Sequence, residues 1–481
     1  MRFARRAAFG LTLSFSALAF GQSPTPGAAP PMPPLQVTPP PPPPAPLQSL
    51  ANRGLKFPKD KGDPRRTGPN LSQSKTPSEG VQIAASGDDV YVVWSDRAEG
   101  NGDIFLAVSN DAGASWWPNV NVSRSSTHSM RPTIAVDGRS VVIGWLEVVG
   151  GEMTAWVATS NDGENAIGAP RKVSRDGAVI QSVRAAAGKG KMAVAFIEQG
   201  GSQAALLSVP RYRELGVAQE ATVDVTRVTG GWDLRSPHLA LGNAGVAMSW
   251  EQRAPLTSAW QVQRATMTSG AWTVSGTQET AIGGRAVHRG ELTASFGLRV
   301  DGQTTVLMPL TPSPVDQSRV EAMLVNAANP QLVVPAGAFD AQGVFVGAWL
   351  GGTLQAPTVK IWEAGPKPAS GLAMPQREET LGPAARTSAL GVAAGANGSR
   401  LVVAALPTDP NRAPGQIVAW SLRRSSDPSA RSMYASSTLF DVARTTTASQ
   451  PVVAATASRF VVAYVDESSG APDVFVRSLP Q

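Results

Sequence analysis

Residues 90–96 read VYVVWSD, and residues 141–147, 51 positions further on, read VVIGWLE. Each stretch is a short apolar run that ends in an aromatic residue, one further residue and a carboxylate. The flanking segments also correspond: 81–85 (VQIAA) with 132–136 (PTIAV), and 103–109 (DIFLAVS) with 154–160 (TAWVATS). Glycine, asparagine, aspartate, serine and proline separate these segments, and no helical 3.6-residue period is sustained. The sequence therefore predicts an all-β chain built from a repeat.

The same order of segments recurs along the remainder of the chain. We place the central strands of the later units at 192–198, 246–251, 304–309, 344–350, 401–406 and 460–466. A fourth segment follows the third strand, most clearly at 119–123 and 222–226. Four strands per unit with a period of about 50 residues predict a β-propeller, because each small sheet buries its faces only against its neighbours. We expect about eight four-stranded blades. Units five to seven match least well, so seven blades remain an alternative.

The two ends of the repeat region predict how the ring closes. The last unit ends after its third strand, at 474–478, and is one strand short. The segment before the first unit, 69–72 (PNLS), resembles 118–121 (PNVN), which stands where a fourth strand is expected. We therefore predict that an N-terminal strand completes the last blade. Closure of this kind ties the first blade to the last and removes an exposed sheet edge.

Two segments of different composition precede the repeat. Residues 1–21 combine a basic start with an apolar run at 7–20 and small residues at positions 19 and 21, as in a signal peptide. Residues 22–68 read as a proline-rich linker, and residues 69–481 as the propeller. We therefore expect export to the periplasm, the cell surface or the extracellular space. No stretch approaches the roughly 20 apolar residues of a membrane helix, so no transmembrane span is expected in the mature chain.

Composition argues against several classes of site. The chain has no cysteine, which rules out disulfides, thiolate zinc sites and cysteine nucleophiles. Its formal net charge of +6 includes three arginines of the predicted signal peptide, so nucleic acid is not an expected partner. The histidines His128, His238 and His288 lack metal-ligand spacing, and glycine-rich phosphate loops are missing. These patterns predict no cofactor.

One turn carries a recognisable motif. Residues 109–116 (SNDAGASW) fit Ser-x-Asp-x-Gly-x-Ser-Trp, and a truncated copy, SNDG, stands at 160–163. The motif resembles the Asp-box, or BNR repeat, of the sialidase (neuraminidase) superfamily of β-propellers. We assign a structural role to its four defining residues: Ser109, Asp111, Gly113 and Trp116. The aspartate accepts backbone N–H groups in a tight turn, the glycine supplies a positive φ, and the tryptophan covers the hairpin.

The resemblance also bears on activity. Catalytic sialidases carry an arginine triad for the substrate carboxylate, a tyrosine nucleophile paired with a glutamate, and an aspartate acid/base. The Arg-Ile-Pro strand typical of their first blade is absent here, and the nearest string is RPTI at 131–134. The sequence therefore favours a noncatalytic protein, and catalytic residues stay unassigned. An exo-glycosidase of sialidase type, acting on acidic sugars, is the alternative.

Two patterns define a candidate ligand site. The predicted central strands end in a carboxylate in five neighbouring units: Asp466, Asp96, Glu147, Glu198 and Glu251. An arginine stands at the entrance to the first strand in four units: Arg131, Arg184, Arg235 and Arg289. Blade topology is expected to place both sets on one face, opposite the Asp-boxes. Arginine forks and paired acids suit an acidic sugar, whereas arginines paired with acids of adjacent blades would instead lock the ring.

The loop after the first central strand is a candidate cation site. It offers Asp96, Glu99, Asn101 and Asp103 as oxygen donors, which suit Ca²⁺. The loop lacks the regular spacing of an EF-hand, so a solvated turn is the simpler alternative.

The sequence as a whole predicts an exported propeller that binds a glycan or an envelope protein through the arginine and carboxylate face. A purely structural envelope protein is a third hypothesis.

Overall fold

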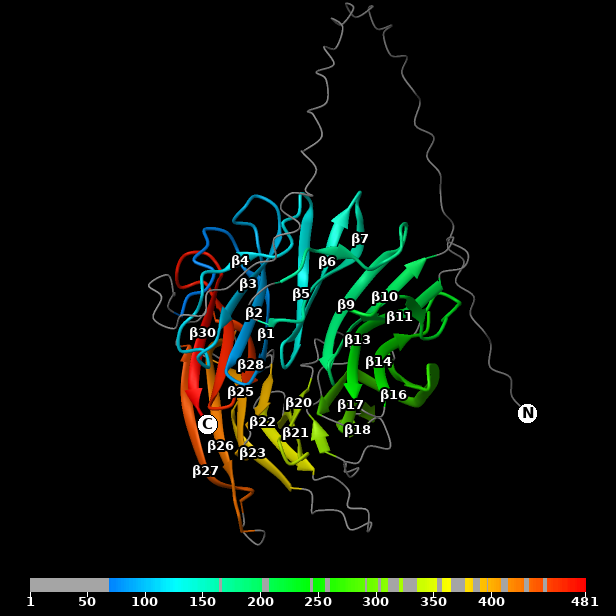
Figure 1. The fold of residues 1–481 in the computed structure, drawn as a ribbon. Helices are drawn as coiled ribbons and strands as arrows, with labels where there is room; N and C mark the ends of the chain where they lie inside the picture. The colour runs from blue at the N-terminus through cyan, green and yellow to red at the C-terminus, as the bar shows by residue number, and fades with distance from the viewer. Residues whose placement is uncertain are drawn as a thin grey trace, which may run out of the picture. The chain divides into compact units, whose positions relative to one another are not determined.

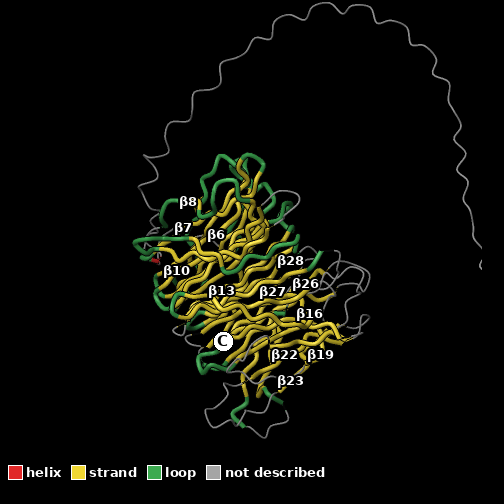
Figure 2. Tube along the Cα trace, turned by 90° about the vertical axis from the view of Figure 1, so that its right-hand side faces the viewer, coloured by secondary structure: helices red, strands yellow, loops and turns green. Residues whose placement is uncertain are grey.

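The computed structural model describes residues 69–481 with gaps, so the predicted signal peptide and linker lie outside the described residues. The gaps are 164–166, 201–206, 243–244, 256–259, 290–291, 302–303, 310–319, 323–334, 353–356, 365–376, 384–389, 396, 408–413, 428–431 and 444–447. Figure 2 shows that the described chain consists largely of strands joined by loops. It contains no helix that is both long and apolar enough to cross a membrane.

The blades follow one another in chain order, and neighbouring strands in each blade pair antiparallel. Blade 1 consists of β1 (Glu79–Ser86), β2 (Asp89–Asp96), β3 (Asp103–Ser109) and β4 (Val120–Asn121). Blade 2 consists of β5 (His128–Asp137), β6 (Ser140–Val149), β7 (Glu152–Ser160) and β8 (Arg171–Lys172). Blade 3 consists of β9 (Val179–Gly188), β10 (Lys191–Gly200), β11 (Leu207–Leu215) and β12 (Thr222–Asp224). Blade 4 consists of β13 (Asp233–Gly242), β14 (Gly245–Arg253), β15 (Trp260–Thr268) and the first part of β16 (Ala271–Arg289).

The second half of the chain continues the pattern. Blade 5 consists of the second part of β16, β17 (Leu292–Asp301), β18 (Thr304–Pro309) and β19 (Val320–Ala322). Blade 6 consists of β20 (Ala336–Phe339), β21 (Phe345–Gly352), β22 (Pro357–Ala364) and β23 (Arg377–Pro383). Blade 7 consists of β24 (Gly391–Ala394), β25 (Ser399–Pro407), β26 (Pro414–Arg424) and β27 (Tyr434–Ala443). Blade 8 consists of β28 (Ser449–Ala455), β29 (Arg459–Asp466) and β30 (Asp473–Pro480).

The strand β16 joins blades 4 and 5 without a break. Its residues up to Thr280 pair with β15, and its residues from Ala281 onward pair with β17. The described residues therefore form eight blades rather than seven. The prediction of 304–309 as the central strand of the fifth unit was wrong, because that segment is β18 and the central strand is β17. No turn separates the outer strand of blade 4 from the inner strand of blade 5, so this unit shows one sequence break fewer than the others.

The innermost strands form a closed ring. They pack in the order β1, β5, β9, β13, β16, β20, β24 and β28, and β28 packs against β1. In Figure 1 the orange and red strands of the last blades accordingly lie beside the blue strands of the first. The predicted β-propeller is thus confirmed.

The second strand of a blade is buried on both faces, which explains its nearly continuous apolar sequence. In β2, Tyr91 and Val93 belong to the core between blades 1 and 2, whereas Val92 and Trp94 belong to the core between blades 8 and 1. Alternate side chains of a strand point to opposite faces, so one strand contributes to two inter-blade cores.

The chain segment before β1 closes the ring. Asn70 forms an antiparallel bridge with Phe475 of β30, and the backbone N–H of Leu71 donates to the carbonyl of Val474 (2.8 Å). Leu71 is buried in the core between blades 8 and 1. Next to this bridge, Ser72 Oγ and Asn70 Nδ2 donate to the buried carboxylate of Asp473 (2.6 and 2.9 Å). The predicted closure of blade 8 by an N-terminal strand is therefore confirmed.

This seam predicts a pH-dependent contribution to stability. Burial alone would raise the pKa of Asp473, but hydrogen bonds from Ser72, Asn70 and Ser469 hold that pKa below its ordinary value. The stabilisation is therefore complete above the unfolded pKa of about 3.9, and is lost as the pH falls through the folded value. We expect Asp473→Asn to lower the free energy of unfolding at pH 7 by about 1–3 kcal/mol.

Thermal melts of Asp473→Asn and of wild type from pH 7 to pH 3 check this expectation. The difference in Tm is expected to shrink below about pH 4. Glu152→Gln, at an exposed position of β7, is the control and should leave the Tm unchanged. A deficit of Asp473→Asn that stays constant down to pH 3 would contradict the assigned role.

Candidate ligand site in the central cavity

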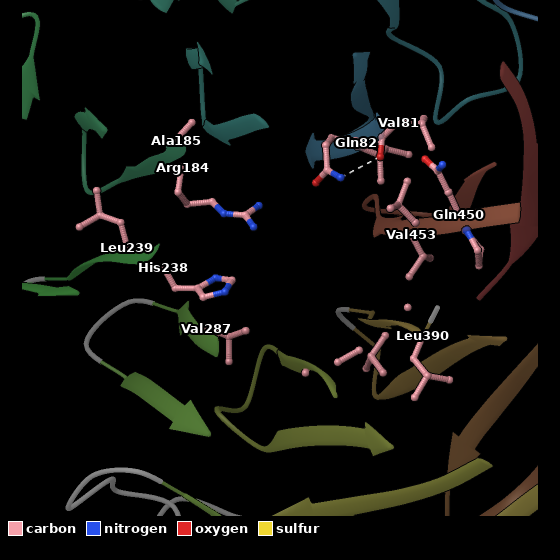
Figure 3. Close-up of a pocket in the computed structure, with 17 residues that line it drawn as sticks. Val81, Gln82, Arg184, Ala185, His238, Leu239, Val287, Leu390, Gln450 and Val453 are labelled. Carbon is pink, nitrogen blue, oxygen red and sulfur yellow. Dashed lines mark hydrogen bonds between the residues drawn. The ribbon is translucent and has the colours of Figure 1, made fainter. Parts of the chain in front are cut away.

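A cavity of about 520 Å³ lies among the innermost strands (Figure 3). Its lining residues come from β1, β9, β13, β16, β20, β24 and β28 and from the residues beside them. Apolar side chains such as Ile83, Leu239 and Val453 form much of the wall. The volume falls within the range of small-molecule sites, roughly 300–1,000 Å³.

The described lining includes four polar side chains: Gln82, Arg184, His238 and Gln450. Figure 3 shows the guanidinium of Arg184 and the imidazole of His238 pointing into the same space from the adjacent strands β9 and β13. The Gln82 amide, which donates to the carbonyl of Val81 (2.8 Å), lies across from Arg184. None of the described lining residues is an aspartate, glutamate or tyrosine.

Strand register brings the polar residues to one level of the ring. Gln82, Arg184 and His238 pair with the residue that precedes the buried aromatic of the second strand, namely Val93, Ala195 and Ser249. The same level is occupied by Thr133 in blade 2, Ala336 in blade 6 and Val452 in blade 8. At this level the residues of blades 1 to 4 are polar, whereas those of blades 6 and 8 are small or apolar.

A β-bulge precedes this level in several innermost strands. Its residue with positive φ is Gly80 in β1, Arg131 in β5, Ser236 in β13 and Gln450 in β28. Proline follows it in the last three strands, which an inner edge strand tolerates because the missing N–H has no ladder partner there. Gln450 Oε1 accepts the N–H of Gly80 across the seam between blades 8 and 1 (3.1 Å). The bulges therefore help to connect blades around the cavity.

The four predicted arginines do not share one position. Among the three whose side chains are described, Arg184 is the one that lines the cavity. Arg131 is exposed at the bulge of β5, with its Nη1 3.5 Å from the carbonyl oxygen of Gln181. Arg235 forms an ion pair with Glu251 inside blade 4 (2.6 Å), so it has an acid partner, but one within its own blade instead of the adjacent one that would lock the ring.

Arg289 was placed wrongly. It is the last residue of β16, where it pairs with Leu292 across the turn between the first and second strands of blade 5. Its backbone therefore stands at the exit of the first strand instead of at the entrance, and its side chain lies outside the described residues. The error follows from the misassigned strand order of this blade.

The carboxylates Asp96 and Glu147 are buried and bound by hydroxyl groups. Asp96 accepts hydrogen bonds from Ser74 (2.8 Å), Thr76 (2.6 Å) and Ser78 (2.5 Å). Glu147 accepts equivalent bonds: from Ser125 (2.6 Å), Thr127 (2.8 Å) and Ser129 (3.4 Å). Each set of three hydroxyls belongs to the connection that arrives from the preceding blade. We call this arrangement the hydroxyl clamp.

The other three predicted carboxylates are also buried. Glu198 pairs with Arg175 and with the buried Arg211. Asp466 accepts the N–H of Ser468 (2.9 Å).

Glu251 does not occupy the position of Glu147, as the sequence alignment of the units assumed. The matching residue in blade 4 is Gln252, because Trp250 Nε1 donates to it as Trp145 Nε1 does to Glu147. Alternation along the strand therefore directs Glu251 to the opposite face of the sheet.

The hydroxyl clamp was missed in the sequence, although it leaves a clear signal. Residues 70–78 read NLSQSKTPS and residues 121–129 read NVSRSSTHS, again 51 positions apart. Alternating hydroxyls of each segment bind the buried carboxylate, and Gln73 and Arg124, at the same position of the motif, share a φ of 46°. Residues 441–449 (DVARTTTAS) keep the pattern in sequence.

The proposed Ca²⁺ ligands bind different protein partners. Asp96 is held by the hydroxyl clamp, Asp103 accepts from Ser123 (2.6 Å), and Glu99 accepts from the amide of Asn121 (2.8 Å). Asn101 donates to the carbonyl of Ser126 (3.0 Å). Within the described chain, no three histidine or acidic side chains gather in a way that would hold a metal ion.

The Asp-box turn is held by its own side chains. Ser109 Oγ donates to Asp111 Oδ1 (2.7 Å), and the same carboxylate accepts the N–H of Ser115 (2.9 Å). Gly113 has a φ of 77°, and a Cβ placed there would come within 2.8 Å of Val461. Trp116 is buried in the core between blades 8 and 1.

One tyrosine meets a glutamate and an arginine, but away from the cavity. The hydroxyl of Tyr434 donates to Glu363 (3.1 Å), which also binds Arg400 (2.9 Å). Asp340 is the second partner of Arg400 (2.6 Å), and all four residues are buried between blades 6 and 7. Burial raises the pKa of Tyr434 well above its ordinary value. This group is an internal ion network, and none of its members lines the cavity.

The fold defines this chain as a β-propeller, and the described inner strands enclose a central cavity. No family model and no curated protein matches it. Similar solved structures include a Trypanosoma rangeli sialidase bound to 2,3-difluorosialic acid, at 11% identity and a TM-score of 0.37 over 89% of this chain and 57% of that one. This chain thus spans little more than half of that sialidase.

Two other structures are similar in fold. One is the WD40 domain of SCAP from fission yeast, at 9% identity and a TM-score of 0.47, covering 87% of this chain and 99% of that one. The other is a PL25 ulvan lyase bound to a saccharide, at 11% identity and a TM-score of 0.45, covering 86% of this chain and 96% of that one.

The hydroxyl clamp predicts a stability effect at a position remote from any ligand chemistry. Thr127→Val keeps the side-chain shape but removes one donor to the buried Glu147. We expect a loss of about 1.5–3 kcal/mol in the free energy of unfolding, the usual contribution of a hydrogen bond to a charged group. Urea denaturation of Thr127→Val, with Thr438→Val on the exposed face of β27 as control, measures it. Equal midpoints for the two variants would show that the clamp does not stabilise the joint.

Proposed function

We propose that this protein is an exported propeller that binds the carboxylate of an acidic sugar in its central cavity without cleaving it. The observation that carries the proposal is that the side chains of Arg184 and His238 enter one cavity (Figure 3), whose described lining contains no aspartate or glutamate. A guanidinium offers two parallel N–H donors to a carboxylate, and such charge-assisted bonds are about twice as strong as neutral ones. The apolar wall opposite would cover the less polar faces of a sugar ring.

The same lining argues against glycosidic cleavage. Retaining and inverting enzymes need two carboxyl groups that flank the bond, and sialidases use a tyrosine with a glutamate. The carboxylates predicted for that role are held by hydroxyls or arginines: Asp96 and Glu147 in hydroxyl clamps, and Glu198 and Glu251 in ion pairs. The exo-glycosidase alternative thus lacks a suitable pair among the described residues.

The cavity also favours a glycan over an envelope protein as the ligand, because its polar groups are recessed within the ring instead of spread over a flat face. The predicted signal peptide and proline-rich linker support a place outside the cytoplasm, where acidic polysaccharides are available. The linker would hold the propeller at a distance from its point of attachment.

A binding experiment on Arg184 tests the proposal. We expect wild type to bind acidic but not neutral glycans on an array, and Arg184→Gln to bind about 10- to 100-fold more weakly. Arg139→Gln is the matched control, since it removes an exposed arginine, with 73% side-chain exposure, that is not among the described lining residues. Its affinity and Tm should equal those of wild type.

Two outcomes would overturn the proposal. Equal binding by Arg184→Gln and wild type, with both folded, would move the site elsewhere. Hydrolysis of a fluorogenic sialoside by wild type, abolished in Arg184→Gln at an unchanged Tm, would establish the exo-glycosidase instead.

A further inference from the structure

His238 is the one histidine of the described cavity lining, and histidine is the side chain whose ordinary pKa lies nearest to neutral pH. It is 7% exposed, and it points into the space that the guanidinium of Arg184 also enters (Figure 3). Its strand β13 pairs it with Ser249, so a neutral residue stands beside it in the sheet.

The charged groups around His238 are distributed unevenly. Arg184 comes from β9, and the described side chain that β16 contributes to the lining is Val287. On β14 the acid is Glu251, which pairs with Arg235 (2.6 Å). On β10 the acid is Glu198, which pairs with Arg175 and Arg211. The described acids of β13, β14 and β10, namely Asp233, Glu251 and Glu198, thus have arginine partners, and the cation Arg184 shares the cavity with the imidazole.

Burial and a neighbouring cation both disfavour the protonated form of a histidine. An anion in the cavity has the opposite effect, because it gains a second positive partner when the imidazole takes up a proton. By linkage, a ligand that favours protonation must itself bind more tightly where protonation is easier.

We infer that His238 takes up a proton when an anionic sugar binds beside Arg184, so that the site binds more tightly in mildly acidic than in alkaline solution. This inference rests on the proposed function and adds a regulation of the same site. A ligand shared between Arg184 and the imidazolium would be released as the surroundings become alkaline. A neutral sugar would not be affected.

Calorimetric titration of the full chain with glucuronate, and with glucose as the uncharged control, tests the inference. The glucuronate carboxylate stays ionised above about pH 5, so its own titration does not interfere. One linked proton changes the affinity by up to tenfold per pH unit. We expect glucuronate to bind wild type at least about fivefold more tightly at pH 5.5 than at pH 8.0.

The same titrations in buffers of different ionisation enthalpy count the protons taken up, and they need no variant. Uptake of a fraction of a proton to one proton per glucuronate is expected at pH 7. His238→Gln and His238→Asn should show no uptake and a flat pH profile, whereas Arg139→Gln should keep both. Two substitutions are used because His238 is buried, and a melt verifies that each is folded.

The outcomes separate this inference from the proposed function. Binding of glucuronate to wild type with equal affinity at both pH values, or a pH profile that survives in folded His238 variants, would overturn the inference and leave the carboxylate site intact. Failure of folded wild type to bind glucuronate at either pH would overturn both.

Discussion

The joints between the first blades depend on carboxylates buried at the ends of strands and satisfied by hydroxyls of the incoming chain. A buried charge is tolerated only when it is well hydrogen-bonded, since an unsatisfied one costs several kcal/mol. The connection of residues 71–78 therefore meets two acids, Asp473 of blade 8 through Ser72 and Asp96 of blade 1 through its three later hydroxyls. Asp103 and Glu147 receive the next connection in the same way. Each connection is fixed at both ends, so it determines where the following inner strand begins.

Later joints use other chemistry for the same purpose. Between blades 2 and 3, Arg175 donates a hydrogen bond to the buried Glu198, whereas serine and threonine hydroxyls donate to Glu147. Between blades 6 and 7, Arg400, fully buried, bridges Asp340 and Glu363. An arginine fork satisfies two acids with one side chain, whereas a hydroxyl clamp needs three residues in register. The repeat therefore loses its recognisable motif along the chain while the blades keep their geometry.

This difference explains what the sequence revealed and what it concealed. The second strands are buried on both faces and are therefore nearly continuous apolar runs. This is why VYVVWSD and VVIGWLE predicted the blades. The closing strand was visible because 69–72 resembles a later segment of the same chain.

Burial and strand register were not visible in the same way. The sequence does not show whether a carboxylate at a strand end faces solvent or is bound by three hydroxyls. Asp96 and Glu147 were therefore interpreted as ligand-binding groups. A shift of one residue along a strand moves a side chain to the opposite face of the sheet. Glu251 was therefore aligned with acids that face the other way. Because β16 runs from blade 4 into blade 5 without a turn, nothing in the sequence indicated that Arg289 lies at the end of its strand instead of at the beginning.

Inner-strand residues that differ from their counterparts in other blades indicate the candidate site better than the residues that repeat. The inner strands that line the cavity share one packing constraint, and a propeller that needed only a closed ring would be expected to carry small or apolar residues at this level, as at Ala336 and Val452. Gln82, Arg184 and His238 stand at that level instead, in blades 1, 3 and 4. Moving a cation toward the axis of a ring has a desolvation cost that inter-blade packing does not require. The anionic ligand proposed above would offset that cost, so the proposed function is sought in the cavity and not at the carboxylates around it.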